Sequence, residues 1–225
     1  VIGGRFLAAL DGTGLYCFRQ RHCEHCIETR HESGAITYSH QLSVAFLVNT
    51  EGYALPIACE FIENPGERHD KQDCEIKAFH RLAAKLRRQF PQTPFWLLLD
   101  ALHADQNVMR VCRNNGWNFA ITFLDSDVPA LWAEAQRVLA LSPVQRVRGR
   151  PPDGGTRTVR WVNDLDYHGM ELSAVFQTRT DEEGQLVQQC AHLIGRPINH
   201  ENAWNVATSA RQRWRCENEG FNVLK

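Results

Sequence analysis

The segment "FWLLLDAL", residues 95–102, restricts the fold of this chain more than any other feature. It is a continuous apolar run of strand length, which is typical of a strand buried on both faces. Such strands lie in sheets that carry helices on both sides, so the segment predicts an α/β fold. The apolar run is followed at once by an acid, Asp100.

Other patterns place further elements around this strand. "RFLAALDGTG" predicts a first strand whose carboxyl end carries Asp11, and "ITYSHQLSVAFLVN" with "YALPIACEFIE" predicts a hairpin. "DKQDCEIKAFHRLAAKLRRQF" has helical spacing, with Asp70 or Asp73 as its N-cap. A helix at about 104–114, the strand "NFAITFL" and the helix "VPALWAEAQRVLAL" follow. This order predicts a mixed five-stranded sheet flanked by helices.

The region from residue 143 to 197 has a different character. Its short strand patterns are separated by Gly, Pro and Asp turns, and no helical spacing intervenes. We therefore predict a core over residues 1–142, a β-rich insertion over 143–197, and a final helix of the core over 198–225. Within the first part, residues 15–40 form a Cys/His-rich loop.

Composition is that of a globular protein of 225 residues, 43% of them hydrophobic. No apolar run is long enough for a membrane span, no signal peptide is visible, and the start on Val1 suggests a fragment. Most of the eight cysteines are scattered like the reduced core residues of a cytosolic protein. The net charge of −1 excludes bulk attraction to nucleic acid, although three local basic clusters could follow a polyanion.

Asp11 and Asp100 each follow an apolar strand. If the two strands are neighbours, the carboxylates converge, and their repulsion is relieved by a bound cation or a shared proton. A third carboxylate from the final helix would complete an oxygen cage suited to Mg²⁺ or Mn²⁺. Taken singly, each aspartate is explained as well by a turn or a helix cap.

Five stretches together resemble a known family. They are "LDGTG", "HCEHC" with "GAITYSHQ", "KQDCEIKAFHRL", "LLLDALHADQNVMRVC" and "RWRCENEGFNVLK". In this order they resemble the DDE transposases of bacterial insertion sequences, in the group with a β-rich insertion before the catalytic glutamate. The resemblance implies a ribonuclease-H-like core that cleaves DNA at transposon ends and joins the strands to target DNA.

The resemblance also implies roles for single residues. Asp11, Asp100 and Glu217 would be the catalytic acids that hold two Mg²⁺ (or Mn²⁺) ions. The DNA-binding cations implied by the signature helix and the insertion are Arg213, Arg215, Lys225, Arg148 and Arg150. The family's usual tyrosine is replaced by Ala210, and Lys225 follows Glu217 by eight residues, one more than in the usual signature.

The extra residue leaves Glu219 as an alternative to Glu217. In a regular helix Arg213, Glu217 and Gly220 share one face at i+4 and i+3 steps, whereas Glu219 points elsewhere. This geometry favours Glu217. On that face Gly220 would allow a DNA backbone to approach closely.

The loop over residues 15–40 carries a C-x2-C-x4-H-x8-H pattern that is close to a zinc knuckle. It favours Cys23, Cys26 and His31 as ligands of a structural Zn²⁺, with His40 or Cys17 as the fourth. Incidental surface cysteines and histidines are the alternative.

We therefore expect a transposase that acts on DNA as a homodimer in a synaptic complex, in the bacterial cytoplasm at the nucleoid and not at a membrane. One alternative is a ribonuclease-H-like nuclease without strand transfer. The other is an inactive DNA-binding remnant, in which the three acids could be replaced without effect.

Overall fold

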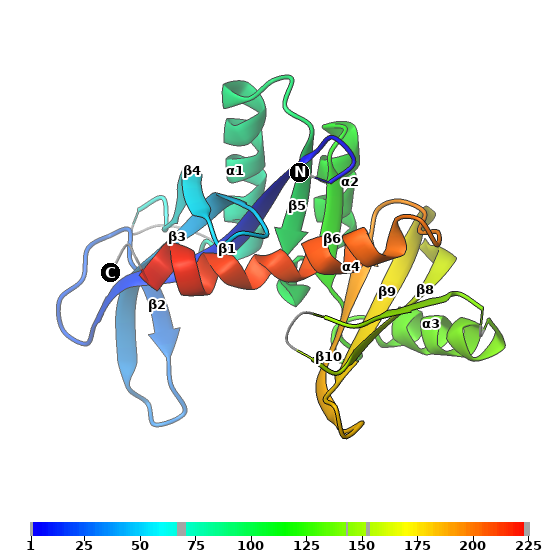
Figure 1. The fold of residues 1–225 in the computed structure, drawn as a ribbon. Coiled ribbons are helices and arrows are strands. Elements are labelled where there is room, and N and C mark those ends of the chain that lie inside the picture. The colour runs from blue at the N-terminus through cyan, green and yellow to red at the C-terminus, as the bar shows by residue number, and fades with distance from the viewer. Residues whose placement is uncertain (1, 67–70, 143, 152–153, 223–225) are drawn as a thin grey trace. The chain divides into compact units, whose positions relative to one another are not determined.

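The computed structural model describes residues 2–66, 71–142, 144–151 and 154–222. The chain divides into two compact units. Unit 1 comprises Val1–Leu7 and Pro94–Trp214, and unit 2 comprises Ala8–Thr93 and Arg215–Lys225. Helices and strands occur in both units, so the predicted mixed α/β class is confirmed (Figure 1). The ribonuclease-H-like arrangement stays a prediction.

Unit 1 is built on a parallel pair of strands, β5 and β6, which is extended by antiparallel strands in the order β10, β9, β8 and β7. The bounds of these strands are β5 Phe95–Leu99, β6 Asn118–Thr122, β7 Arg146–Gly149, β8 Thr156–Tyr167, β9 Met170–Thr180 and β10 Leu186–Ile194. The predicted β-rich insertion therefore continues the same sheet as β5 and β6, through the pairing of β10 with β6.

The helices of unit 1 follow the sequence pattern. Their bounds are α2 Gln106–Asn114, α3 Pro129–Leu141 and α4 Ala203–Ala210. Asp105 caps α2 by accepting hydrogen bonds from the backbone N–H groups of Asn107 and Val108, as expected for an acid at an N-cap. All five residues of β5 are buried, which confirms that this strand is covered on both faces.

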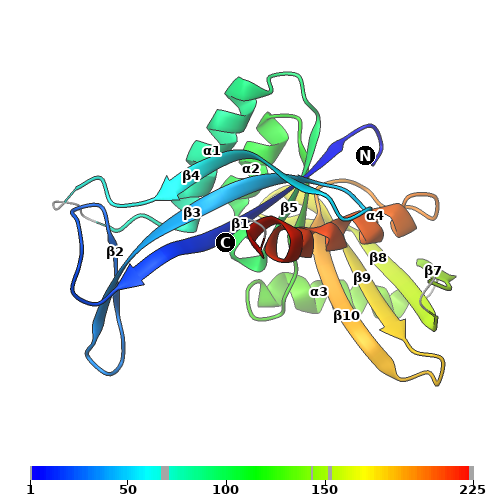
Figure 2. The same ribbon diagram turned by 60° about the vertical axis from the view of Figure 1, so that its left-hand side comes forward.

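Unit 2 contains long antiparallel strands with one helix packed on them (Figure 2). Its elements are β1 Phe6–Phe18, which begins in unit 1, β2 Ile27–Arg30, β3 Ile36–Val48, β4 Ala54–Ile62 and α1 Glu75–Gln89. The hairpin of β3 and β4 is confirmed. β2, which the sequence analysis did not predict, pairs antiparallel with β3.

Two local predictions for unit 2 are wrong. The first strand does not end at Asp11 but continues to Phe18, because Gly12 and Gly14 keep negative φ angles and extend the strand. Asp73 does not cap α1, because its carboxylate is engaged with Arg81 at 2.5 Å. The other proposed cap, Asp70, lies outside the described residues.

The final helix is present but is not a regular α-helix. After α4 the chain forms a 3-10 turn over Arg211–Trp214 and a π-helical turn over Cys216–Phe221. A π-turn closes i→i+5 hydrogen bonds and holds one residue more than an α-turn. Within the described part of the chain, no helix combines the length and the apolar character that crossing a membrane requires.

Candidate active site and metal centre

Asp100 directly follows β5 in unit 1 and is partly exposed. Its Oδ1 lies 2.5 Å from Nδ1 of the buried His103, which belongs to the short turn after the strand. Burial alone would raise the pKa of Asp100. The hydrogen bond and charge of His103 and the charge of Arg213 outweigh burial, so the pKa of Asp100 lies below its usual value. Asp100 is therefore an ionised carboxylate whose charge is compensated by His103 and Arg213.

Arg213 also acts on a histidine that the sequence analysis missed. His192 on β10 is buried, and burial together with the charges of Arg213 and Arg211 lowers its pKa to about 4. The ring is consequently neutral at pH 7. Arg213, the predicted signature arginine, thus acts on the ionised carboxylate of Asp100 and on the neutral ring of His192.

Asp11 belongs to unit 2, where the buried part of β1 gives way to its exposed part. Its Oδ1 accepts a hydrogen bond from the backbone N–H of Gly12 at 3.0 Å, and its Oδ2 lies 3.5 Å from Sγ of the buried Cys216. The C-terminal turn of the chain therefore returns to the strand that carries the first predicted acid. Glu75, at the start of α1, lies against the Cα of Gly12.

Glu217 follows Cys216 in the π-helical turn and is exposed. Glu219 is held by Arg215, whose Nη1 donates to both of its carboxylate oxygens at 2.8 and 2.9 Å. Arg215 also donates to the carbonyl of Thr50. The predicted DNA-binding Arg215 therefore has partners within unit 2, and the choice between Glu217 and Glu219 stays a prediction.

The role suggested for Gly220 is wrong. Gly220 is buried, and a Cβ at this position would lie 2.8 Å from Cε1 of Phe46 on β3. Glu217 is exposed while Gly220 is buried, so the two do not share a face as a regular helix would require. The glycine allows the C-terminal turn to pack on β3 rather than DNA to approach.

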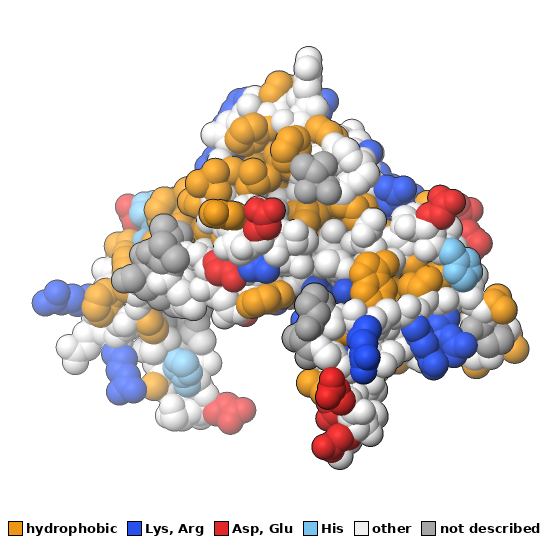
Figure 3. All heavy atoms as spheres, viewed as in Figure 1, with side chains coloured by type: hydrophobic (Ala, Val, Ile, Leu, Met, Phe, Trp, Pro, Cys, Tyr) orange, Lys and Arg blue, Asp and Glu red, His pale blue; other side chains and the backbone are white. Residues whose placement is uncertain are grey.

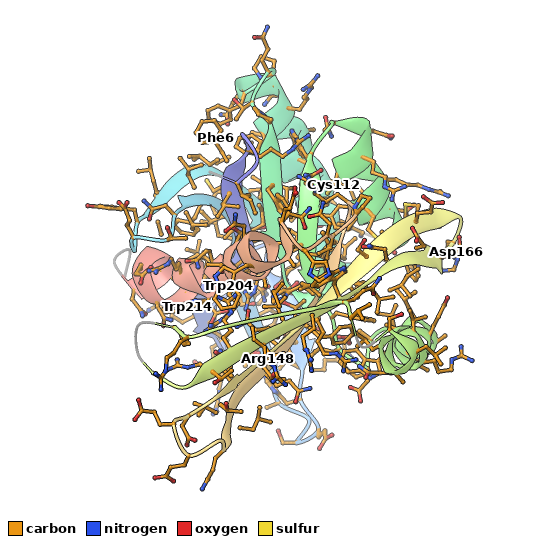
Figure 4. The ribbon with its side chains drawn as sticks, turned by 45° about the vertical axis from the view of Figure 1, so that its right-hand side comes forward. Phe6, Cys112, Arg148, Asp166, Trp204 and Trp214 are labelled. Carbon is orange, nitrogen blue, oxygen red and sulfur yellow. The ribbon has the colours of Figure 1, made fainter. Side chains whose placement is uncertain are left out.

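The remaining predicted DNA-binding cations are placed as follows. Arg148 lies on β7 (Figure 4). Arg150 follows this strand, and both side chains are exposed. Figure 3 shows basic side chains on this part of unit 1. Lys225 lies outside the described residues.

A cysteine–histidine group lies where the loop after β1 meets β3 in unit 2. Cys23 Sγ lies 3.7 Å from Cys26 Sγ and 3.1 Å from His40 Nε2. The ligand atoms of all three residues lie within 4.8 Å of one another. Sulfur and imidazole nitrogen are the usual donors to Zn²⁺, so this group could hold a metal ion.

This group contains His40 but not His31, which the spacing favoured as a ligand. Among the described residues, His31 lies outside the group at the turn after β2, with its Nε2 2.9 Å from Thr37 Oγ1. Cys17 is exposed on β1 and lines a surface groove together with His31. Of the two histidines that the spacing offered, His40 lies in the group and His31 does not, because His40 directly follows Ser39, which pairs with Ile27 beside the cysteine turn.

Comparison with known proteins identifies no family. No protein-family model matches the chain, and no curated protein matches it significantly. The interpretation of function consequently depends on the residues themselves.

Proposed function

We propose that this chain is the catalytic domain of a DDE transposase of a bacterial insertion sequence, which cleaves DNA at transposon ends and joins them to target DNA. One observation carries the proposal. Cys216, whose thiol contacts the carboxylate of Asp11, is the immediate neighbour of Glu217. A contact between the first predicted acid and the residue next to the last one supports the proposal.

The proposed chemistry assigns a task to each residue. Asp11, Asp100 and Glu217 would hold two Mg²⁺ or Mn²⁺ ions through carboxylate oxygens, the ligands these cations prefer. When bound, the two ions would activate the attacking water or 3′-hydroxyl and stabilise the leaving oxygen.

The cations would hold the DNA. Arg213, near Asp100, would bind the phosphate next to the scissile bond, and Arg148, Arg150 and Lys225 would bind flanking phosphates. Because such contacts release counterions, DNA affinity should fall steeply with salt. We further propose a homodimer in a synaptic complex with transposon ends and target DNA, in the bacterial cytoplasm. The Cys23–Cys26–His40 group would hold a structural Zn²⁺ that is separate from the catalytic ions.

Strand transfer tests this function. The DNA flanking the gene supplies the terminal inverted repeats, and labelled end DNA is incubated with the full-length protein, target plasmid and Mg²⁺. We expect cleavage and joined products, and loss of both in Asp11→Asn, Asp100→Asn and Glu217→Gln. Glu219→Gln is the matched control and should retain both reactions.

Each alternative predicts another outcome. Cleavage without joining would identify a nuclease and contradict the proposal. DNA binding that persists without cleavage in the unaltered protein would identify an inactive remnant. Equal loss of activity in Glu217→Gln and Glu219→Gln would refute the assignment of the third acid.

A further inference from the structure

The two cysteines of the group have the separation of sulfur ligands in a tetrahedral zinc site. Two sulfur atoms bound to Zn²⁺ at about 2.3 Å in a tetrahedron lie about 3.8 Å apart. Cys23 Sγ and Cys26 Sγ are 3.7 Å apart. The backbone N–H of Cys23 points to Cys26 Sγ at 3.4 Å, and the N–H of Cys26 donates to the carbonyl of Cys23, so the two residues form a tight turn that presents both sulfurs together.

A carboxylate lies on the far side of the His40 ring. Its Nε2 faces Cys23, whereas its Nδ1 lies 3.9 Å from Oε2 of Glu63, a distance longer than a hydrogen bond. A metal bound to Nε2 would lie on the opposite side of the ring from Glu63. Carboxylates commonly orient metal-ligating histidines through the other ring nitrogen, which is the side on which Glu63 lies.

A buried asparagine links the group to α1. The side chain of Asn64, which is 2% exposed, donates through Nδ2 to the carbonyl of Cys26 at 2.7 Å. Its Oδ1 accepts a hydrogen bond from the backbone N–H of Asp73 at 3.0 Å. Two residues later, Glu75 begins α1 and lies against Gly12. A continuous path of contacts therefore connects the cysteine turn with the strand that carries Asp11.

We propose that a Zn²⁺ ion held by Cys23, Cys26 and His40 sets the position of the start of α1 through Asn64, and thereby holds Glu75 beside the strand of Asp11. Glu63 is the positioning residue for His40. The inference depends on the zinc ion of the proposed function but not on strand transfer, and its tests use no DNA.

The first test is metal binding by the purified chain. After chelation and reloading with Co²⁺, we expect the intense visible bands of tetrahedral cobalt and a near-ultraviolet thiolate band, both displaced by Zn²⁺. Cys23→Ser and His40→Ala should lose these bands, whereas the controls Cys17→Ser and His31→Ala should keep them. Loss in the controls with retention in His40→Ala would overturn the ligand set.

The role of Glu63 requires a measurement that a general loss of stability would not reproduce. In Glu63→Gln we expect Zn²⁺ affinity, measured by competition with a chromophoric chelator, to fall about 10–100-fold, with the Co²⁺ spectrum of the loaded protein retained. Unchanged affinity would remove Glu63 from the proposal.

Hydrogen exchange tests the link to α1. Removing Zn²⁺ should accelerate exchange of the amides at the start of α1 and at Gly12, while α2 in unit 1 serves as the internal reference. Asn64→Ala should bind Zn²⁺ but show the fast exchange of the metal-free protein. Exchange at α1 that is insensitive to metal, or slow exchange in Asn64→Ala, would refute the coupling.

Discussion

Protonation of His192 should lower the free energy of unfolding of unit 1 in mild acid. The side chain lies on β10, whose register neighbours at this position are Thr122 on β6 and Val175 on β9, and Arg211 and Arg213 act on it from the C-terminal segment. Protonation would place a third positive charge next to two arginines in a buried site. The folded protein therefore resists protonation of this ring.

The size of the effect follows from the pKa. Folding lowers the pKa of His192 from about 6.5 to about 4. Stability from the neutral ring is fully present above pH 6.5 and is lost as the pH falls toward 4, because the unfolded chain binds the proton first. At 1.36 kcal/mol per pKa unit the full loss is about 3 kcal/mol, of which about 2 kcal/mol is lost by pH 5.

Urea unfolding at pH 7 and pH 5 measures this loss. The comparison is between the unaltered chain and His192→Gln, because all other titrating groups are common to both proteins. We expect the free energy of unfolding of the unaltered chain to fall by about 2 kcal/mol more than that of His192→Gln. An equal fall in both proteins would show that His192 is not held neutral and would refute the reasoning.

Three further substitutions test the packing that supports the site, each by urea unfolding. Gly220→Ala forces a methyl group against an aromatic ring and should cost about 1–3 kcal/mol, whereas Gly14→Ala, whose new Cβ would meet nothing within 4 Å, should cost far less. Arg81→Met leaves the buried carboxylate of Asp73 without its cation and should cost about 3 kcal/mol, part of which Asp73→Asn should restore in the double variant. Asp105→Ala removes the N-cap of α2 and should cost about 1 kcal/mol, whereas a loss below about 0.3 kcal/mol would contradict the capping geometry.

The sequence predicted the elements whose burial is continuous or periodic. A strand buried on both faces has a continuous apolar run, as in Phe95–Leu99. A helix buried along one stripe has apolar residues at helical spacing, as in α1. β2 has four residues and exists through its pairing with β3, so its own sequence carries little signal. The continuation of β1 past Asp11 was not predicted, because Gly12 and Gly14 are typical of a turn but lie within the strand.

Site residues could be predicted where residues of a ligand type lie close together in the sequence. Cys23 and Cys26 are such a pair, since two intervening residues fix the distance between their sulfurs. His40 was predicted as a possible fourth ligand and lies in the group through the pairing of β2 with β3, whereas His31, which the sequence favoured, lies outside it. His192 had no signal at all, because its pKa depends on arginines that follow it by about twenty residues and reach it only in the fold.

The C-terminal turn departs from the regular helix that the sequence predicts. The π-helical turn over Cys216–Phe221 begins one residue before Glu217 and accommodates one additional residue per turn, so i+3 and i+4 steps no longer define one face of this segment. The same turn buries Cys216 near Asp11 and Gly220 against Phe46 while Glu217 remains exposed, so the packing of its buried side on β1 and β3 decides which residues of the turn face outward.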